Sequence, residues 1–199
     1  MGTLVGIALC VGNKRAVATA PTGIMTFADP AMQALCAQTW GDGTNITYEQ
    51  AREVTEIPKN WAKGNTTITS FNEIKYFKNC RTIGASAFER CSSMALTSLE
   101  LPQCKSIGNY AFHSCSSMKS IELPSTVTAI GPSAFQYCTG LTRVSITAAT
   151  PPSLGSSAFA NCSALTGIYV PDESVEAYKT ATNWSAYANI ILPLSQYKG

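Results

Sequence analysis

Ala87-Phe88-Glu89-Arg90-Cys91, Ala111-Phe112-His113-Ser114-Cys115, Ala134-Phe135-Gln136-Tyr137-Cys138 and Ala158-Phe159-Ala160-Asn161-Cys162 are four copies of one pattern, Ala-Phe-x-x-Cys. Successive copies lie 24, 23 and 24 residues apart. A fixed period of this size indicates one supersecondary unit stacked on copies of itself, because each unit alone is too small to bury its apolar face. The sequence therefore predicts a solenoid whose function lies on its surface.

A short strand of alternating apolar and polar residues follows each copy of the pattern. We expect strands at 99–101, 121–123, 144–146 and 168–170, each with one outward residue between two core residues. Proline follows three of them, which suits a strand end because proline cannot donate to the ladder. A second apolar line, in which each residue is followed by Gly, marks the other edge of each coil: Ile83, Ile107, Ile130 and Leu154.

The cysteines follow the same period. Four of them hold the last place of the pattern, and Cys80 and Cys104 hold another place, where Val127 stands in the next unit. A position that accepts Cys or Val is an apolar core position, and a free cysteine behaves as a small hydrophobe. We therefore predict two buried ladders of reduced thiols. Ligands spread along a solenoid axis cannot converge on zinc, so we expect no metal site among them.

The composition of the 199-residue chain disfavours several classes of function. Charged residues make up 13% of it and the net charge is +2, which argues against nucleic acid and anionic membranes as partners. No stretch approaches the roughly 18 apolar residues of a membrane span. The longest apolar stretch, 4–11, precedes its basic residues, which inverts the order of a secretory signal. We interpret residues 3–19 as a hairpin, with a removable signal as the alternative.

Capping signals predict helices on both sides of the repeats. Asp29 before Pro30 has the form of an N-cap, and Thr47 with Gln50 has the form of a capping box for a second helix that ends near Val54. Residues 171–179 are typical of a short helix that Asp172 would cap and that would cover the last coil. We divide the chain into an N-terminal hairpin and helix-loop-helix, a repeat array and a C-terminal cap: 1–67, 68–170 and 171–199.

The pattern over 81–170 resembles the BspA-type leucine-rich repeat, because it combines the strand with Pro, the Ile-Gly step and the Ala-Phe-x-x-Cys turn. Residues 68–77 are similar to the opening segment of that family, and the closing segment through Trp184 is similar to its end in proteins of gut Bacteroides-type bacteria. The resemblance implies an α+β fold, a right-handed leucine-rich-repeat solenoid with short parallel strands, over about two-thirds of the chain.

The helix-loop-helix also resembles a module that often precedes such arrays and whose loop looks like a calcium-binding EF-hand. An EF-hand loop needs several carboxylates and a closing bidentate Glu to surround Ca²⁺ with oxygen. This loop offers only Asp42, and Gln50 stands where the closing Glu would fall. We therefore expect no bound metal and no cofactor.

Few residues could support catalysis. His113 is the single histidine, and the equivalent residues of the other units, Glu89, Gln136 and Ala160, indicate a surface turn rather than half of a Cys-His pair. Glu100 and Glu122 are predicted to face the same way on adjacent strands. A glycosidase pair would also need a cleft, so we interpret them as exposed neighbours whose repulsion basic side chains moderate. We expect no enzyme.

The family resemblance implies a surface or secreted binding protein. Our first hypothesis is a non-enzymatic recognition or adhesion module outside the cell, which binds a protein or glycan of a host or bacterial surface through the repeat sheet. The alternative is a structural or receptor-binding component of a bacteriophage particle, assembled through the N-terminal region. The candidate contact surface is an outward row of side chains: Glu100, Glu122, Arg143, Ser145 and Tyr169.

Overall fold

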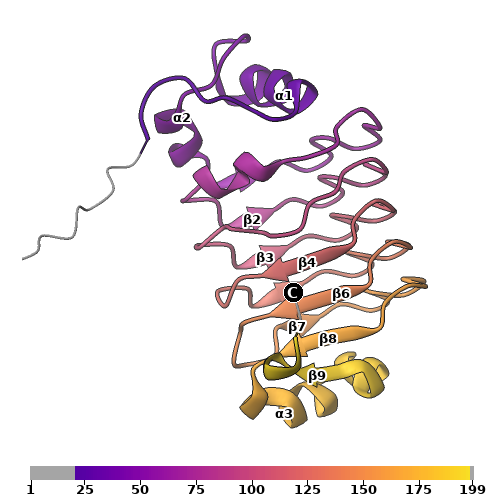
Figure 1. The fold of residues 1–199 in the computed structure, drawn as a ribbon. Helices are drawn as coiled ribbons and strands as arrows, with labels where there is room; N and C mark the ends of the chain where they lie inside the picture. Colours follow the sequence, from indigo (N-terminus) through magenta and orange to yellow (C-terminus); the bar gives the residue numbers. More distant parts are fainter. Residues whose placement is uncertain (1–20, 198–199) are drawn as a thin grey trace, which may run out of the picture.

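The computed structural model describes residues 21–197 as an array of coils stacked along one axis, with helical segments at both ends (Figure 1). Two parallel ladders of short strands run along this array. The hairpin predicted at 3–19 lies outside the described residues. The leucine-rich-repeat fold with parallel strands is confirmed.

The first ladder has the order β1-β2-β3-β5-β7. Its strands are two residues long: β1 (Glu56–Ile57), β2 (Thr82–Ile83), β3 (Ser106–Ile107), β5 (Ala129–Ile130) and β7 (Ser153–Leu154). The predicted apolar line lies on β2, β3, β5 and β7, and β1 extends it upstream of residue 68. The glycine after each of β2, β3, β5 and β7 allows the coils to approach closely, since a Cβ on Gly108 would lie 2.6 Å from the backbone nitrogen of Ala85.

The second ladder has the order β4-β6-β8-β9. Its strands are β4 (Ser120–Leu123), β6 (Arg143–Ile146), β8 (Gly167–Val170) and β9 (Ile191–Pro193). The strands predicted at 121–123, 144–146 and 168–170 are confirmed, whereas the alternation had not indicated β9.

The strand predicted at 99–101 is wrong. That coil joins the ladder through a single bridge between Ser98 and Glu122, and the Leu101 N–H bends back to the carbonyl of Leu99 at 2.7 Å. The physical reason is a longer connection before the proline of this coil. Ser98 follows Phe88 at the same separation at which Glu122 follows Phe112. The distance from the phenylalanine, and not the distance to the proline, therefore decides which residues pair.

A stack of phenylalanine rings and the predicted thiol ladders form the core. The rings of Phe88, Phe112, Phe135 and Phe159 stack with centroids 5.2 Å apart and planes within 8° of parallel. The six cysteines of the two ladders are free and buried, as predicted. The last cysteine of each pattern also donates its S–H to the preceding coil; the Sγ of Cys115, for example, lies 3.1 Å from the carbonyl oxygen of Phe88.

The N-terminal helices have the predicted caps. α1 (Pro30–Trp40) begins after Asp29, whose carboxylate accepts from the N–H of Met32 at 3.0 Å, and α2 (Tyr48–Glu53) begins with the capping box of Thr47. The other carboxylate oxygen of Asp29 accepts from the hydroxyl of Thr69 at 2.7 Å, close to η1 (Asn72–Tyr76). One side chain thus connects the first helix to the start of the predicted array.

The C-terminal segment packs on the last coil. It consists of η2 (Asp172–Ser174), α3 (Val175–Thr180), η3 (Trp184–Ile190), β9 and η4 (Leu194–Gln196). The predicted helix is present, but its cap is wrong. The chain leaves Pro171 in a 3₁₀ turn, and the carboxylate of Asp172 accepts the N–H of Ser195 at 3.0 Å instead of capping α3.

Candidate binding surface

The outward face of β4, β6 and β8 brings three of the predicted side chains side by side. Glu122 is the register partner of Ser145, and Ser145 is the register partner of Tyr169. Arg143 lies two residues before Ser145 on β6, beside Ser120 of β4. Because every strand is held by backbone hydrogen bonds to its neighbour, this row has a fixed spacing.

Glu100 does not occupy the position expected for it. The coil before β4 contributes Ser98 as the partner of Glu122, so Glu100 lies two residues further along the chain. Both glutamates are exposed, and both line a small hollow of about 210 Å³ together with Thr147. The structure therefore brings the two carboxylates to one hollow but not to directly paired positions.

The prediction that Ser145 is exposed is wrong, because it has only 6% of its surface accessible. Tyr197 lies over the two predicted residues that flank it. Its ring centroid is 5.0 Å from that of Tyr169 and 5.5 Å from the guanidinium carbon of Arg143. The C-terminal segment thus covers part of the face. The repeat pattern could not indicate this contact, since Tyr197 belongs to no repeat.

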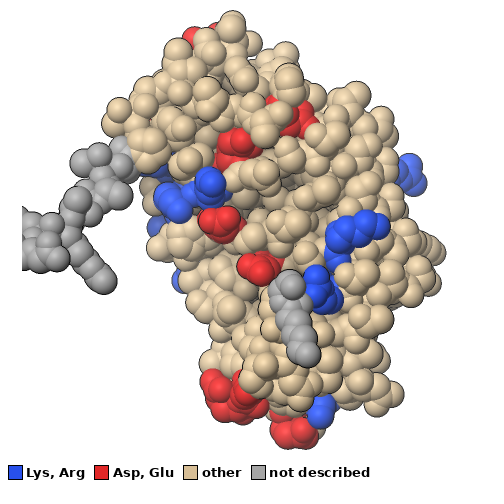
Figure 2. Space-filling view, viewed as in Figure 1, with Lys and Arg blue, Asp and Glu red and all other residues tan. Residues whose placement is uncertain are grey.

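Uncharged side chains dominate this side of the molecule. Figure 2 shows acidic and basic side chains scattered singly or in small groups among neutral ones. A surface of this kind recognises a partner through shape, hydrogen bonds and aromatic contacts rather than through a strong field.

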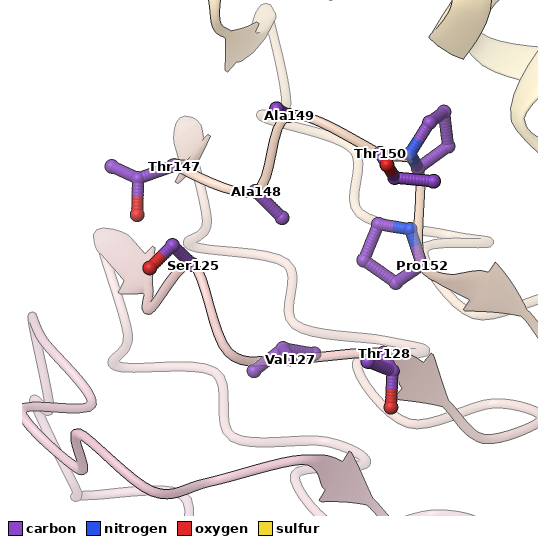
Figure 3. Close-up of a pocket in the computed structure, with 9 residues that line it drawn as sticks. Ser125, Val127, Thr128, Thr147, Ala148, Ala149, Thr150 and Pro152 are labelled. Atoms are coloured by element: carbon purple, nitrogen blue, oxygen red, sulfur yellow. The ribbon is translucent and has the colours of Figure 1, made fainter.

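A larger hollow of about 580 Å³ lies at the edge of the array, between the loop that precedes β5 and the loop that precedes β7. Figure 3 shows its walls, which are hydroxyl groups, methyl groups and proline rings: Ser125, Val127, Thr128, Thr147, Ala148, Ala149, Thr150, Pro151 and Pro152. The wall before β7 is held from beneath, because the carbonyls of Ala148 and Ala149 accept hydroxyl hydrogen bonds from Tyr178 and Ser174. The only sequence signal for this hollow was the irregular spacing before Pro151.

The possible Cys-His pair is not assembled. Cys115 is buried with its thiol directed at a backbone carbonyl, and burial raises its pKa well above the ordinary value. The Nδ1 of His113 lies 3.0 Å from the hydroxyl of Ser114 instead. His113 is half-buried in a surface turn.

The side chain of Asp42 forms hydrogen bonds within its own loop, the one that resembled an EF-hand. The Oδ1 of Asp42 accepts the N–H groups of Thr44 and Asn45 at 2.8 and 2.6 Å, and these bonds lower its pKa. Within residues 21–197, no three His, Cys, Asp or Glu side chains gather in a way that could hold a metal ion. In the same part of the chain, no helix is both long and apolar enough to cross a membrane.

Comparison with known proteins identifies the repeats. The family model described as BspA type leucine-rich repeat region matches residues 55–189 in six copies, which begins after the helix-loop-helix and gives no support to its EF-hand resemblance. No curated protein matches the chain.

Proteins of three bacteria are among the solved structures that match the chain. A leucine-rich cell surface protein of Faecalibacterium prausnitzii is 24% identical over 59% of this chain and 36% of its own, with a TM-score of 0.41. A leucine-rich repeat protein of Bacteroides ovatus is 24% identical over 71% and 42%, with a TM-score of 0.43. Internalin C2 of Listeria monocytogenes is 14% identical over 84% and 94%, with a TM-score of 0.26. The chain thus spans less than half the length of the first two.

Proposed function

We propose, from the premise that the chain belongs to the BspA type leucine-rich repeat family, that it is a non-enzymatic recognition module. Leucine-rich repeat proteins are typically protein-interaction modules, because stacked coils present an extended surface of regular spacing. The proposed ligand is a protein or glycan of a host or bacterial surface. The proposed site of action is outside the cell, as the family resemblance implies, and the comparisons give no support to the phage-particle alternative.

The observation that carries this proposal is the fixed row on the second ladder. Glu122, Ser145 and Tyr169 occupy neighbouring register positions on three hydrogen-bonded strands. Such a row offers a carboxylate and an aromatic ring, separated by the buried Ser145, without any cost of ordering a loop, which favours binding. The buried thiols and the half-buried His113 supply no comparable arrangement for catalysis.

We further propose that residues 171–199 serve as the C-terminal cover of a right-handed solenoid. Trp184 and Tyr178 are fully buried in this segment, and each donates a hydrogen bond to a carbonyl of the loop before β7. An array needs such a cover, since its last coil would otherwise expose an apolar face. The division into 1–67, 68–170 and 171–199 is part of this proposal.

The test of recognition compares two changes on the same face. The full chain would be titrated against a panel of extracellular-matrix proteins, bacterial surface proteins and immobilised glycans. We expect the double variant Arg143→Ala with Tyr169→Ala to lose about 10-fold or more in affinity for a ligand found there, because aromatic and Arg side chains dominate such contacts.

Tyr197→Ala is the matched control. It removes the ring that lies on Arg143 and Tyr169 but leaves both residues in place, so it separates the loss of the face from the release of the C-terminal segment. We expect its affinity to be equal to or higher than that of the wild type. Unchanged affinity of the double variant would place the site elsewhere, and a wild-type chain that binds nothing on the panel would contradict recognition.

A further inference from the structure

Tyr110, His113 and Tyr137 form an aromatic cluster on the turn edge of the array, away from the sheet face. The ring of His113 lies 5.6 Å from that of Tyr110 and 5.5 Å from that of Tyr137, at steep angles of 61° and 68°. The two tyrosines come from consecutive coils and are 44% and 46% exposed. We call these three residues the Tyr-His cluster. Both phenol side chains remain exposed to solvent although each ring packs against the imidazole.

The backbone beneath the cluster does not call for tyrosine. Each turn has two residues in the left-handed region, one before the Ala of the pattern and one before the Cys, and Tyr110 and Tyr137 have φ of 57° and 60° there. The other coils place smaller or more flexible residues at these positions: Ser86, Ser133 and Ser157 at the first, and Arg90, Ser114 and Asn161 at the second. A bulky ring is an uncommon choice in this region, and such outliers cluster at functional sites.

The backbone of these turns is already paired between coils. The N–H groups of Tyr110, Phe112 and Ser114 donate to carbonyls of the next coil at 3.0, 2.7 and 2.8 Å. An extended peptide recognised by strand addition needs unpaired backbone groups, which these donors do not supply. A ligand at the cluster must therefore be recognised by side chains.

The groups around the cluster favour a neutral ligand. Glu89, on the preceding coil, is held by Lys63 at 2.9 Å and lies 3.9 Å from Arg90, so these charges are engaged with one another. Burial acts to raise the pKa of Glu89, but the hydrogen bonds from Lys63 and Ser86 and the nearby positive charge together outweigh it, and the pKa lies below the ordinary value. The other polar groups are two phenol hydroxyls, the imidazole and the half-buried amide of Gln136.

We propose that the Tyr-His cluster is a binding site for a neutral sugar ring of a glycan. A pyranose has an apolar C–H face and a rim of hydroxyls, which matches an exposed phenol ring accompanied by hydroxyl, imidazole and amide groups. His113 connects the two tyrosines across consecutive coils, and the hydroxyl of Ser114 orients its ring. The inference rests on the proposed recognition function, names its ligand class and adds a site beyond the sheet face.

The experiment applies the full chain to an array of neutral and sialylated glycans and measures the affinity of the neutral glycans that bind by calorimetry. Tyr110→Ser and Tyr137→Ser are the test variants, because serine stands at the same two backbone positions in other coils and the turns therefore tolerate it. We expect each variant to lose about 10-fold or more in affinity, which is about 1.4 kcal/mol, because it removes one of the two rings on which the sugar would stack. Thermal unfolding at or above the wild-type midpoint would verify that the variants fold.

Asn60→Ser is the control, because it makes the same kind of change at the corresponding left-handed position of another coil, where φ is 58°. We expect it to bind the same neutral glycans within about twofold of the wild type. Unchanged binding by the serine variants, binding of sialylated glycans alone, or no glycan binding by the wild type would each overturn the inference. A chain that binds a protein through Arg143 and Tyr169 but no glycan would overturn it while leaving the proposed recognition function in place.

Discussion

The two ends of the array are closed by different chemistry. Inside the array, each first-ladder carbonyl accepts an N–H from the next coil, as Ile130 does from Gly155 at 2.7 Å. Leu154, on the last coil, has no such successor, and the side-chain amide of Asn183 donates to its carbonyl at 2.6 Å. The N–H of Phe159 likewise donates to the hydroxyl of Tyr187 at 3.2 Å, in the place of a carbonyl.

At the N-terminal end, aromatic packing and two buried carboxylates make the corresponding contacts. One of them is Glu73, whose Oε1 accepts the N–H of Ala28 at 3.0 Å. Trp61 lies 4.8 Å from Trp40 of α1 and 5.7 Å from Phe88, the first ring of the phenylalanine stack. Asp29 adds the hydrogen bonds that join α1 to Thr69. An array can therefore end on apolar rings with buried carboxylates, or mainly on neutral donors and acceptors that replace a missing coil. The first kind of end is expected to be the more sensitive to acid, because Asp29 is buried, whereas the lowered pKa at the C-terminal end belongs to the exposed side chain of Asp172.

Trp184→Ala should break the C-terminal end with the largest effect. The indole is fully buried, contacts Phe159 and donates to the carbonyl of Pro152 at 2.7 Å, so its loss should cost about 3–5 kcal/mol of unfolding free energy. Urea unfolding measures this cost. Because coils contact only their neighbours, hydrogen exchange should accelerate at Gly155 while Gly84 stays protected. Equal acceleration at both ends would contradict this picture.

Asp29→Ala should weaken the N-terminal end by about 2 kcal/mol at neutral pH. Burial acts to raise the pKa of Asp29, but hydrogen bonds from Thr69, Met32 and Ser70 outweigh it and lower the pKa to about 2. A folded-state pKa below the unfolded value adds stability above the unfolded pKa of 3.8, and this stability is lost as the pH falls toward 2. Urea unfolding at pH 7 and pH 2 should therefore show a difference from the wild type at pH 7 that shrinks at pH 2. A difference independent of pH would contradict the ionised contact.

Tyr178→Phe should have a smaller effect at the opposite end. It removes the hydroxyl that donates to the carbonyl of Ala148 at 2.8 Å and leaves a buried acceptor without that donor, at a cost of about 1–2 kcal/mol. Thermal unfolding is the measurement. Burial raises the pKa of Tyr178, so the phenol is neutral throughout the acidic range and the cost should be the same at pH 7 and pH 4. A cost that varied with pH in this range would contradict the proposed difference between the ends.

Tyr187→Phe should have the smallest effect, about 0.5–1 kcal/mol, because its hydroxyl accepts a longer hydrogen bond and the side chain is half-buried. Hydrogen exchange at the Phe159 amide should be faster than in the wild type, because this N–H loses its acceptor. Thermal unfolding of the two phenylalanine variants side by side tests the order. If Tyr187→Phe is less stable than Tyr178→Phe, the loss of an acceptor for the Phe159 N–H costs more than the loss of a buried donor, and the expected order is wrong.

The repeat spines could be predicted from the sequence because their residues have no substitute. Phe112 and Cys115 recur in register since a stacked ring and a thiol that donates to the preceding coil each need one size and one chemistry. The coil upstream of residue 68 was missed because Trp61-Ala62 stands where Ala87-Phe88 stands in the next coil, which reverses the large and small residues. The backbone is nevertheless the same, with the N–H of Ala62 donating to Ala87 at 2.7 Å.

The candidate surface could be predicted only in part. The alternation placed Glu122 and Tyr169 correctly on the outward row, because strand period alone decides which face a residue occupies. It misplaced Glu100, since the alignment followed Pro102 instead of the phenylalanine. It also missed the burial of Ser145 and the contact between Tyr197 and Tyr169. Tyr197 lies in a segment that does not repeat, so the repeat pattern of the sequence carries no signal for its contacts.

The reactivity of the buried thiols reports which coils of the array unfold first. Burial raises the pKa of Cys91 to about 11 and of Cys104 to about 12, and it is the thiolate form of a cysteine that attacks an alkylating reagent. Each thiol therefore reacts only after its own coil has separated from the next. Pulsed alkylation with mass spectrometry would date the opening of successive coils from Cys80 to Cys162, and so reveal which end of the unmodified chain unzips first.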